Sequence, residues 1–165
     1  MNTIEKIILR ENKVLKLNNV LVREVSESEF TDINKVGHMM ESYIKSKGNA
    51  ILGPMINYSR AEITESGQAK IILKFMVQLK NPVYNVETPY SIEKQIRVTN
   101  CLFARYSEKE ENLQFAYSKL QLHAFEKDIK LKGDSYTVFV ENKDGKVVAD
   151  VFMEVEKEAL ASDGL

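Results

Sequence analysis

Two stretches of the chain repeat one order of apolar and polar residues. Residues 19–29 (NVLVREVSESE) and, 81 positions later, residues 100–110 (NCLFARYSEKE) each hold a short apolar run that ends in Ser-x-x-Glu. This order is typical of a strand followed by a capped helix, because the serine hydroxyl can accept a bond from the third helical N–H while the glutamate reaches back. A repeat with a fixed period indicates a duplicated α+β module.

The first half predicts a strand at 20–25, a helix over about 27–47 and strands at 55–63 and 70–79. Apolar residues of this helix recur at i, i+3 and i+4 spacing and form one core-facing stripe: Phe30, Ile33, Val36, Met40, Tyr43 and Ile44. Gly37 lies on the same side, where a missing side chain would let a strand come close. Strand 70–79 alternates between a fully apolar face and a mixed face, which predicts burial of one side.

The second half predicts the same elements again. A strand at 95–106 precedes a helix over about 108–131, and strands follow at 135–141 and 146–155. The helix presents its own apolar stripe to the sheet: Leu113, Ala116, Tyr117, Leu120 and Ala124.

Turn residues separate these elements. Asp144-Gly145 between two alternating runs predicts a hairpin, and residues 81–93, with two of the three prolines, predict the connection between the halves. The resulting order is β-α-β-β twice. Hairpins after each helix, without βαβα alternation, predict an α+β fold in which an antiparallel sheet carries both helices on one face.

The repeats define the expected domain organisation. Residues 19–155 are predicted to form a single domain of two pseudo-repeats, 19–80 and 95–155. Residues 1–18 fit either a leading strand and turn or a short helix, and residues 156–165 read as a polar tail.

The composition narrows the classes of partner. The 165 residues are 44% hydrophobic and 28% charged, which is typical of a globular protein. With 23 basic and 24 acidic side chains there is no cationic field for a phosphate backbone or an anionic lipid surface, so neither nucleic acid nor a membrane is an expected partner. The single cysteine, Cys101, is expected to be buried and inert. No signal sequence or span of ~20 apolar residues is visible, which predicts a cytoplasmic protein.

The order of elements, the internal pseudo-symmetry and the pattern that leads from Gly133 through an aromatic strand to the final VFMEVE run resemble the GyrI-like family. This bacterial family includes the effector-binding domains of multidrug-sensing transcription regulators and the stand-alone gyrase inhibitory proteins. The resemblance covers about residues 20–155. The chain is also similar to a small group of Gram-positive proteins of this fold that are encoded near type VII secreted toxins.

The resemblance implies a groove on the sheet face away from the helices, which takes a small, often cationic and aromatic, ligand. The family's aromatic-Glu-x-aromatic motif corresponds to Tyr136-Thr137-Val138-Phe139, so Thr137 stands where the family has a groove-facing carboxylate. A hydroxyl cannot replace that charge beside a desolvated cation. The departure argues against cation sensing and against the chemistry of the few hydrolytic members. Only some 18 residues precede the repeat, so a stand-alone binder without a DNA-binding segment is expected.

Alternation along the strands predicts which side chains face such a groove. If the apolar series Leu73, Phe75, Val77 and Val147, Ala149, Val151, Met153 packs beneath the helices, the opposite face carries a semi-apolar set from the other positions. Tyr90 could close the groove from the connection. The candidate ligand-binding residues are Asn57, Met76, Thr137, Phe139, Phe152 and Tyr90.

Two functions compete for this face. The first is a non-enzymatic module that binds a small neutral or weakly polar ligand. The second is an interaction module that holds a protein partner or a second copy as a homodimer, as an accessory to secreted toxins. His38 and His123 each stand alone and no phosphate loop or nucleophile elbow is present, so no catalytic residue, metal site or cofactor is predicted.

Overall fold

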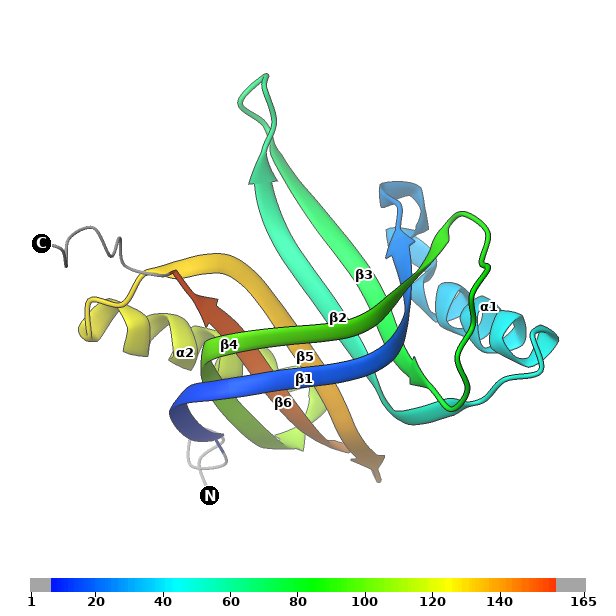
Figure 1. Ribbon diagram of the computed structural model, residues 1–165. Coiled ribbons are helices and arrows are strands. Elements are labelled where there is room, and N and C mark those ends of the chain that lie inside the picture. Colours follow the sequence, from blue (N-terminus) through cyan, green and yellow to red (C-terminus); the bar gives the residue numbers. More distant parts are fainter. Residues whose placement is uncertain (1–6, 157–165) are drawn as a thin grey trace, which may run out of the picture.

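The computed structural model describes residues 7–156 (Figure 1). The first repeat contains β1 (Ile7–Val25), the 3₁₀ helix η2 (Glu27–Asp32), α1 (Ile33–Ser46), β2 (Ile51–Ile63) and β3 (Ala69–Leu79). The second contains β4 (Tyr90–Lys109), the 3₁₀ helix η3 (Glu110–Asn112), α2 (Gln114–Glu126), β5 (Leu131–Lys143) and β6 (Lys146–Val155). The predicted order, β-α-β-β twice, is confirmed.

The six strands close into an antiparallel barrel in the order β1-β3-β2-β5-β6-β4. The repeats meet twice, since β2 pairs with β5 and the long strands β1 and β4 pair with each other. Figure 1 shows β1 and β4 crossing together in front of the other strands, with α1 and α2 at opposite ends of the molecule. The predicted fold class is confirmed, and the face that carries both helices is the outside of the barrel.

Corresponding positions of the two repeats share unusual backbone angles. Asn19 and Asn100, 81 positions apart, have φ values of 53° and 56°, and Gly53 and Gly133 have φ values of 87° and 98°. Left-handed conformations of this kind favour glycine and asparagine. The duplicated sequence therefore bends the chain in the same way twice.

The two Ser-x-x-Glu motifs have different structures. In the first repeat the Ser26 N–H donates to Glu29 Oε1 over 3.0 Å, as predicted for a helix start. In the second repeat β4 continues to Lys109, and Ser107 pairs with Val148 of β6. The prediction of a helix from about residue 108 is wrong, because the β4–β6 ladder extends to the tip of the β5–β6 hairpin and delays the start of α2.

β1 is longer than the sequence predicts. It begins at Ile7 and runs without a break to Val25, so the expected boundary at residue 18 falls inside this strand. Of the two alternatives for residues 1–18, the leading strand is the correct one for residues 7–18, without the expected turn. Residues 1–6, and residues 157–165 of the expected polar tail, lie outside the described part of the chain.

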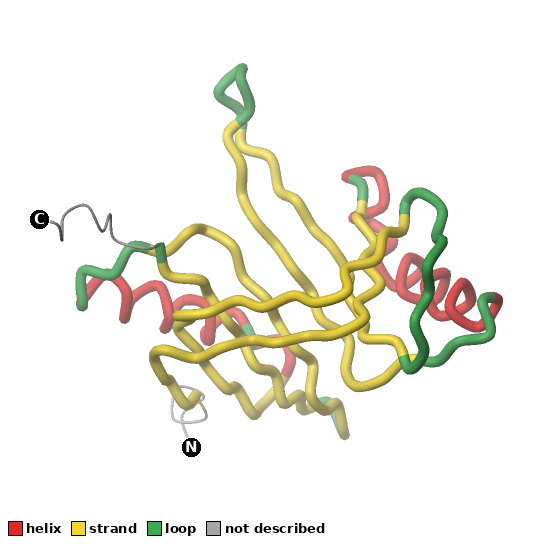
Figure 2. Tube along the Cα trace, in the orientation of Figure 1, coloured by secondary structure: helices red, strands yellow, loops and turns green. Residues whose placement is uncertain are grey.

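The helices cover separate parts of the outer barrel wall. α1 buries Val36, Met40 and Ile44 against β1 and β3, and α2 buries Ala116, Leu120 and Ala124 against β4 and β6. The predicted burial of Phe75 and Val77, and of the series from Val147 to Met153, beneath the helices is confirmed. Figure 2 shows the two helices far apart, with the β2–β3 hairpin projecting away from the barrel. Within residues 7–156, no helix combines the length and the apolar character needed to cross a membrane.

Candidate ligand-binding cleft

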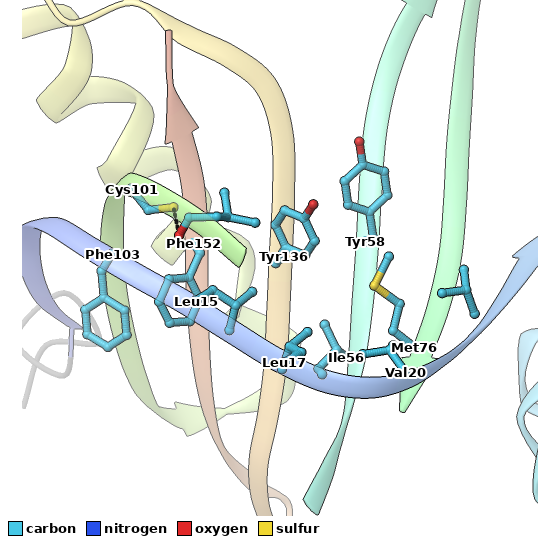
Figure 3. Packing of buried hydrophobic residues seen from close by; sticks show 12 residues of the cluster. Leu15, Leu17, Val20, Ile56, Tyr58, Met76, Cys101, Phe103, Tyr136 and Phe152 are labelled. Atoms are coloured by element: carbon cyan, nitrogen blue, oxygen red, sulfur yellow. Dashed lines mark hydrogen bonds between the residues drawn. The ribbon is translucent and has the colours of Figure 1, made fainter. Parts of the chain in front are cut away.

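The sheet face away from the helices, which was expected to form the groove, is the packed interior of the barrel (Figure 3). Its side chains come from all six strands: Leu15, Leu17, Val20, Val22, Ile56, Tyr58, Met76, Val98, Cys101, Phe103, Tyr136 and Phe152. Met76 and Phe152 lie here as predicted, but they are only 6% and 8% exposed. The paired strands β1 and β4 form an arch over this face, and their apolar side chains fill the expected groove.

Cys101 lies in this interior and is fully buried, as predicted. Burial raises the pKa of its thiol to about 11, with smaller contributions from the charges of Glu154 and Asp134. A thiol that stays protonated at neutral pH is a poor nucleophile and a poor metal ligand. Cys101 therefore acts as a small apolar core residue.

Asn57, Thr137 and Phe139 do not face the interior. Asn57 pairs with Phe75 on one side and with Thr137 on the other. Directly paired residues of an antiparallel sheet point to the same side, and Phe75 packs beneath α1. Phe139 packs against the core beneath α2. The prediction that these three residues share a face with Met76 and Phe152 is wrong.

The physical reason is the phase of the alternation in β2 and β5. β3 and β6 each have one wholly apolar face, so their phase can be counted from the sequence. β2 and β5 carry mixed residues on both faces, and their pairing is irregular between Leu52 and Ile56 and between Leu131 and Ser135. At each of these irregularities β2 or β5 has two more residues than its partner, which leaves the facing of the later residues unchanged. The facing of β2 and β5 is therefore fixed by their partners β3 and β6, and their own mixed sequences do not reveal it.

Tyr90 lies beside α1 and not at the barrel interior. Its ring stacks on Tyr43 with centroids 4.0 Å apart, and the Arg23 guanidinium carbon lies 5.8 Å from the centre of the Tyr90 ring. The six predicted site residues are thus divided among three places: the interior, the outer face over β2 and β5, and the edge of α1.

A cleft of about 400 Å³ opens on the outer face, between α2 and the β2–β3 hairpin. Tyr117 and Gln121 of α2 form one wall, and Ser59 and Ile71 of the hairpin form the other. Leu131, Ser135 and Met153 also line it. Asn57 and Thr137 lie next to this cleft, since they are the next outward-facing pair of the β2–β5 ladder after Ser59 and Ser135.

Four hydroxyls are held together around the cleft. The side chains of Ser59 and Ser135 are hydrogen-bonded over 3.0 Å, and the Tyr117 hydroxyl is hydrogen-bonded to Thr137. Burial raises the pKa of the Tyr117 phenol, and the bond to Thr137 opposes this shift. Because a hydroxyl both donates and accepts, the paired serines keep the capacity to bind a further polar group.

Two charged side chains, Arg60 and Asp134, line the cleft. Arg60 is paired with Glu62 on the same strand. Burial raises the pKa of the Asp134 carboxyl above its ordinary value, with a further contribution from the charge of Glu154. Within residues 7–156, Asp134 Oδ1 is buried and has no hydrogen-bond partner.

Sequence reasoning missed Tyr117, Gln121 and Ser135 as lining residues. Tyr117 was expected only as part of the core stripe of its helix. The corresponding position in the first repeat, 80 residues earlier, is Gly37. A large phenol at the position of a glycine in the duplicated module was the signal that could have marked this wall.

No catalytic or metal-binding constellation is evident in the described part of the chain. Residues 7–156 contain no group of three or more His, Cys, Asp or Glu side chains that could hold a metal ion. His123 Nε2 lies 2.8 Å from Glu11 Oε2, a surface contact between α2 and β1.

Two of the other hollows have less suitable linings. The larger, about 860 Å³, lies beside Arg23, Ser26 and Glu29, but the two terminal nitrogens of Arg23 already donate to both carboxylate oxygens of Glu29 over 2.7 Å. The other, about 700 Å³, is bordered by Leu52 and Tyr84 at the outer edge of the molecule. Tyr84, one of its lining residues, is 84% exposed.

Comparisons with known proteins identify the fold. No protein-family model matches the chain, and no curated protein matches it. The C-terminal domain of EcmrR has a TM-score of 0.59 at 14% identity and covers 92% of this chain and 98% of that domain. EcmrR in its complex with DNA has a TM-score of 0.61 at 13% identity, and this chain spans 57% of its length.

Two further structures have lower scores. A hydrolase from Listeria innocua has a TM-score of 0.51 at 7% identity, with 92% of each chain covered. SAV2435 bound to tetraphenylphosphonium has a TM-score of 0.51 at 8% identity, with 91% of this chain and 93% of that chain covered. Together these likenesses show that the chain has the GyrI-like fold that the sequence pattern predicted.

Proposed function

We propose that the protein is a non-enzymatic binding protein that holds a small, neutral or weakly polar ligand in the cleft between α2 and the β2–β3 hairpin. The observation that carries the proposal is the composition of this cleft, in which the paired Ser59 and Ser135 hydroxyls lie beside the apolar side chains of Ile71, Leu131 and Met153. Its volume of about 400 Å³ falls in the usual range for small-molecule sites.

The preference for a neutral ligand rests on the charges around the cleft. Thr137 stands at the position where the family resemblance expects a carboxylate, and its hydroxyl is engaged by Tyr117. Arg60 is paired, and the pKa of Asp134 is raised by burial. SAV2435 binds a phosphonium cation; at position 137 this chain offers a cation a hydroxyl in place of a carboxylate.

The competing interaction function has less support on the predicted face. Met76 and Phe152 are almost fully buried within the barrel, so they offer a partner little contact area. An accessory role beside a secreted-toxin system stays a prediction.

The test compares two aromatic probes, neutral triphenylphosphine oxide and cationic tetraphenylphosphonium, by isothermal titration calorimetry on the full chain. We expect triphenylphosphine oxide to bind saturably and more tightly than tetraphenylphosphonium. Gln121→Trp, at an exposed position of the cleft wall, should weaken binding by at least about tenfold, or ~1.4 kcal/mol.

Glu41→Trp is the matched control, because Glu41 occupies the corresponding exposed position of α1, 80 residues earlier. It should leave binding unchanged. Equal effects of the two tryptophan substitutions would overturn the proposed site. Tighter binding of tetraphenylphosphonium would overturn the preference for neutral ligands.

A further inference from the structure

The second helix has apolar side chains on both of its faces. One face packs on the barrel through Ala116, Leu120 and Ala124. The opposite face carries Phe115, Leu122 and Phe125, which are 41%, 56% and 84% exposed. We call these three residues the outer stripe of α2. A helix that is apolar all round is normally buried on all sides, but nothing among residues 7–156 covers the outer stripe.

The first helix shows that the fold itself does not require this stripe. Residues 80 positions earlier occupy the corresponding outward places on α1, and they are the exposed polar residues Lys35, Ser42 and Lys45. Both helices pack on the barrel in the same way through their inner faces. The apolar outer stripe is therefore a property added to the second repeat alone.

Two copies of α2 have complementary side chains when they pack against each other. If two copies of α2 cross antiparallel about a twofold axis near residue 120, Phe115 of one copy lies over Phe125 of the other. One flank of the outer stripe carries Glu126, which is exposed, and Lys119, which is half-buried and donates from Nζ to the Ile7 carbonyl over 3.4 Å. In the same arrangement Lys119 of each copy approaches Glu126 of the other, so two opposite-charge pairs border the apolar centre.

The ends of α2 add to this complementarity. Glu110 and Glu111 precede the helix, and Lys127 and Lys130 follow it; all four are exposed. None of them forms an ion pair with another residue in the 7–156 range. Antiparallel crossing brings the acidic start of one helix near these lysines of the other and aligns the two helix dipoles favourably.

From these features we propose that the outer stripe of α2 is the interface of a symmetric homodimer. A single helix of 13 residues, about 20 Å long, on each side buries less than the ~1,200–2,000 Å² of a tight complex. The dimer is therefore expected to be weak, with a dissociation constant of about 10–100 μM. The outer stripe does not line the ligand cleft, so dimerisation and ligand binding can be tested separately.

Sedimentation equilibrium of the full chain over about 1–500 μM tests this interface. The wild type should change from monomer to dimer across this range. Phe125→Glu should raise the dissociation constant at least about tenfold, because it places a charge against the apolar ring of Phe115 in the other copy. Its matched control is Lys45→Glu at the corresponding position of α1, which should dimerise like the wild type.

Exchanging the two charges of the flank distinguishes a homodimer from a complex with any other partner. Glu126→Lys and Lys119→Glu should each weaken the dimer, and the two changes in one chain should restore it, since the exchanged charges still face each other. Binding of triphenylphosphine oxide should be the same in Phe125→Glu as in the wild type. A wild-type chain that stays monomeric up to the highest concentration, or a double variant that remains dissociated, would refute the homodimer.

Discussion

At the scale of single residues, two glycines of the first repeat have equally open surroundings but different backbones. An added Cβ would meet no atom within 4 Å at either Gly37 or Gly48. Gly48 follows α1 and has a φ of 68°, whereas Gly37 lies inside α1 and does not have a positive φ. The expectation that Gly37 allows a strand to come close is wrong, since the space beside it is open.

Gly37→Ala should therefore stabilise the protein. Alanine reduces the conformational freedom of the unfolded chain and suits a helix interior, which is worth about 0.5–1 kcal/mol. Gly48→Ala is the control with the same open space; its left-handed φ should cost about 1–2 kcal/mol. Urea unfolding of the three proteins measures both changes. A loss of stability in Gly37→Ala would show that the position is crowded.

At the scale of elements, a partly buried ion pair joins the end of β1 to η2. Arg23 on β1 is 3% exposed, and its guanidinium donates to both carboxylate oxygens of Glu29 over 2.7 Å. Glu29 also accepts from the Ser26 N–H. The hydrogen bonds from Arg23, then from Ser26, lower the pKa of Glu29 from 4.5 to about 2. This part of the repeat is therefore sensitive to acid.

The sign of the effect follows from the lowered pKa. Glu29 stabilises the fold fully above pH 4.5, and this contribution is lost as the pH falls toward 2. The carboxylate is partly exposed, so solvent screening reduces the loss to about 1–2 kcal/mol. Urea unfolding at pH 6 and pH 3 should show a smaller acid loss in Glu29→Gln than in the wild type.

Glu27→Gln in the same 3₁₀ turn provides the control. Glu27 is exposed and forms no ion pair with the residues from 7 to 156. This variant should keep the wild-type acid loss. An identical loss in all three proteins would exclude Glu29 as the source.

At the scale of the whole molecule, the pairing of β1 with β4 closes the antiparallel sheet into a barrel. Leu15 and Leu17 of β1 are 7% and 4% exposed within the interior. They cover the face that would otherwise be an open groove. The first strand is thus part of the core.

Leu17→Ala should test this closure. Removing a buried leucine side chain costs about 2–5 kcal/mol, whereas Lys16→Ala, on the exposed side of the same strand, should change stability by less than about 0.5 kcal/mol. Urea unfolding distinguishes the two. A small effect of Leu17→Ala would indicate that the arch of β1 and β4 lies open in solution.

Much of the fold follows from local chemistry and could be predicted. The stripes of α1 and α2, the Asp144-Gly145 turn and the wholly apolar faces of β3 and β6 each depend on residues close together in the sequence. β6 runs from Lys146 to Val155, as its alternation predicted. These periodic patterns repeat at a shift of 80 or 81 residues, so the duplication was also predictable.

The candidate site was predicted only in part, because it depends on register between distant strands. Asn57 and Thr137 were expected on the groove face; they pair with each other, but the pairing of Asn57 with Phe75 turns them to the outside. The polar side chains that line the cleft come from the β2–β3 hairpin, α2 and β5, and no local sequence pattern shows that these segments meet.

The sequence by itself determined a duplicated β-α-β-β chain with two amphipathic helices on one side of an antiparallel sheet, since hydrophobic periodicity and turn residues act over short distances. The tertiary structure alone decided that β1 and β4 close the barrel, because their pairing joins residues up to 99 positions apart, from Ile7 to Tyr106. That closure fills the expected groove with leucine, valine and aromatic side chains, and the proposed ligand site is therefore the cleft on the outer face, between α2 and the β2–β3 hairpin.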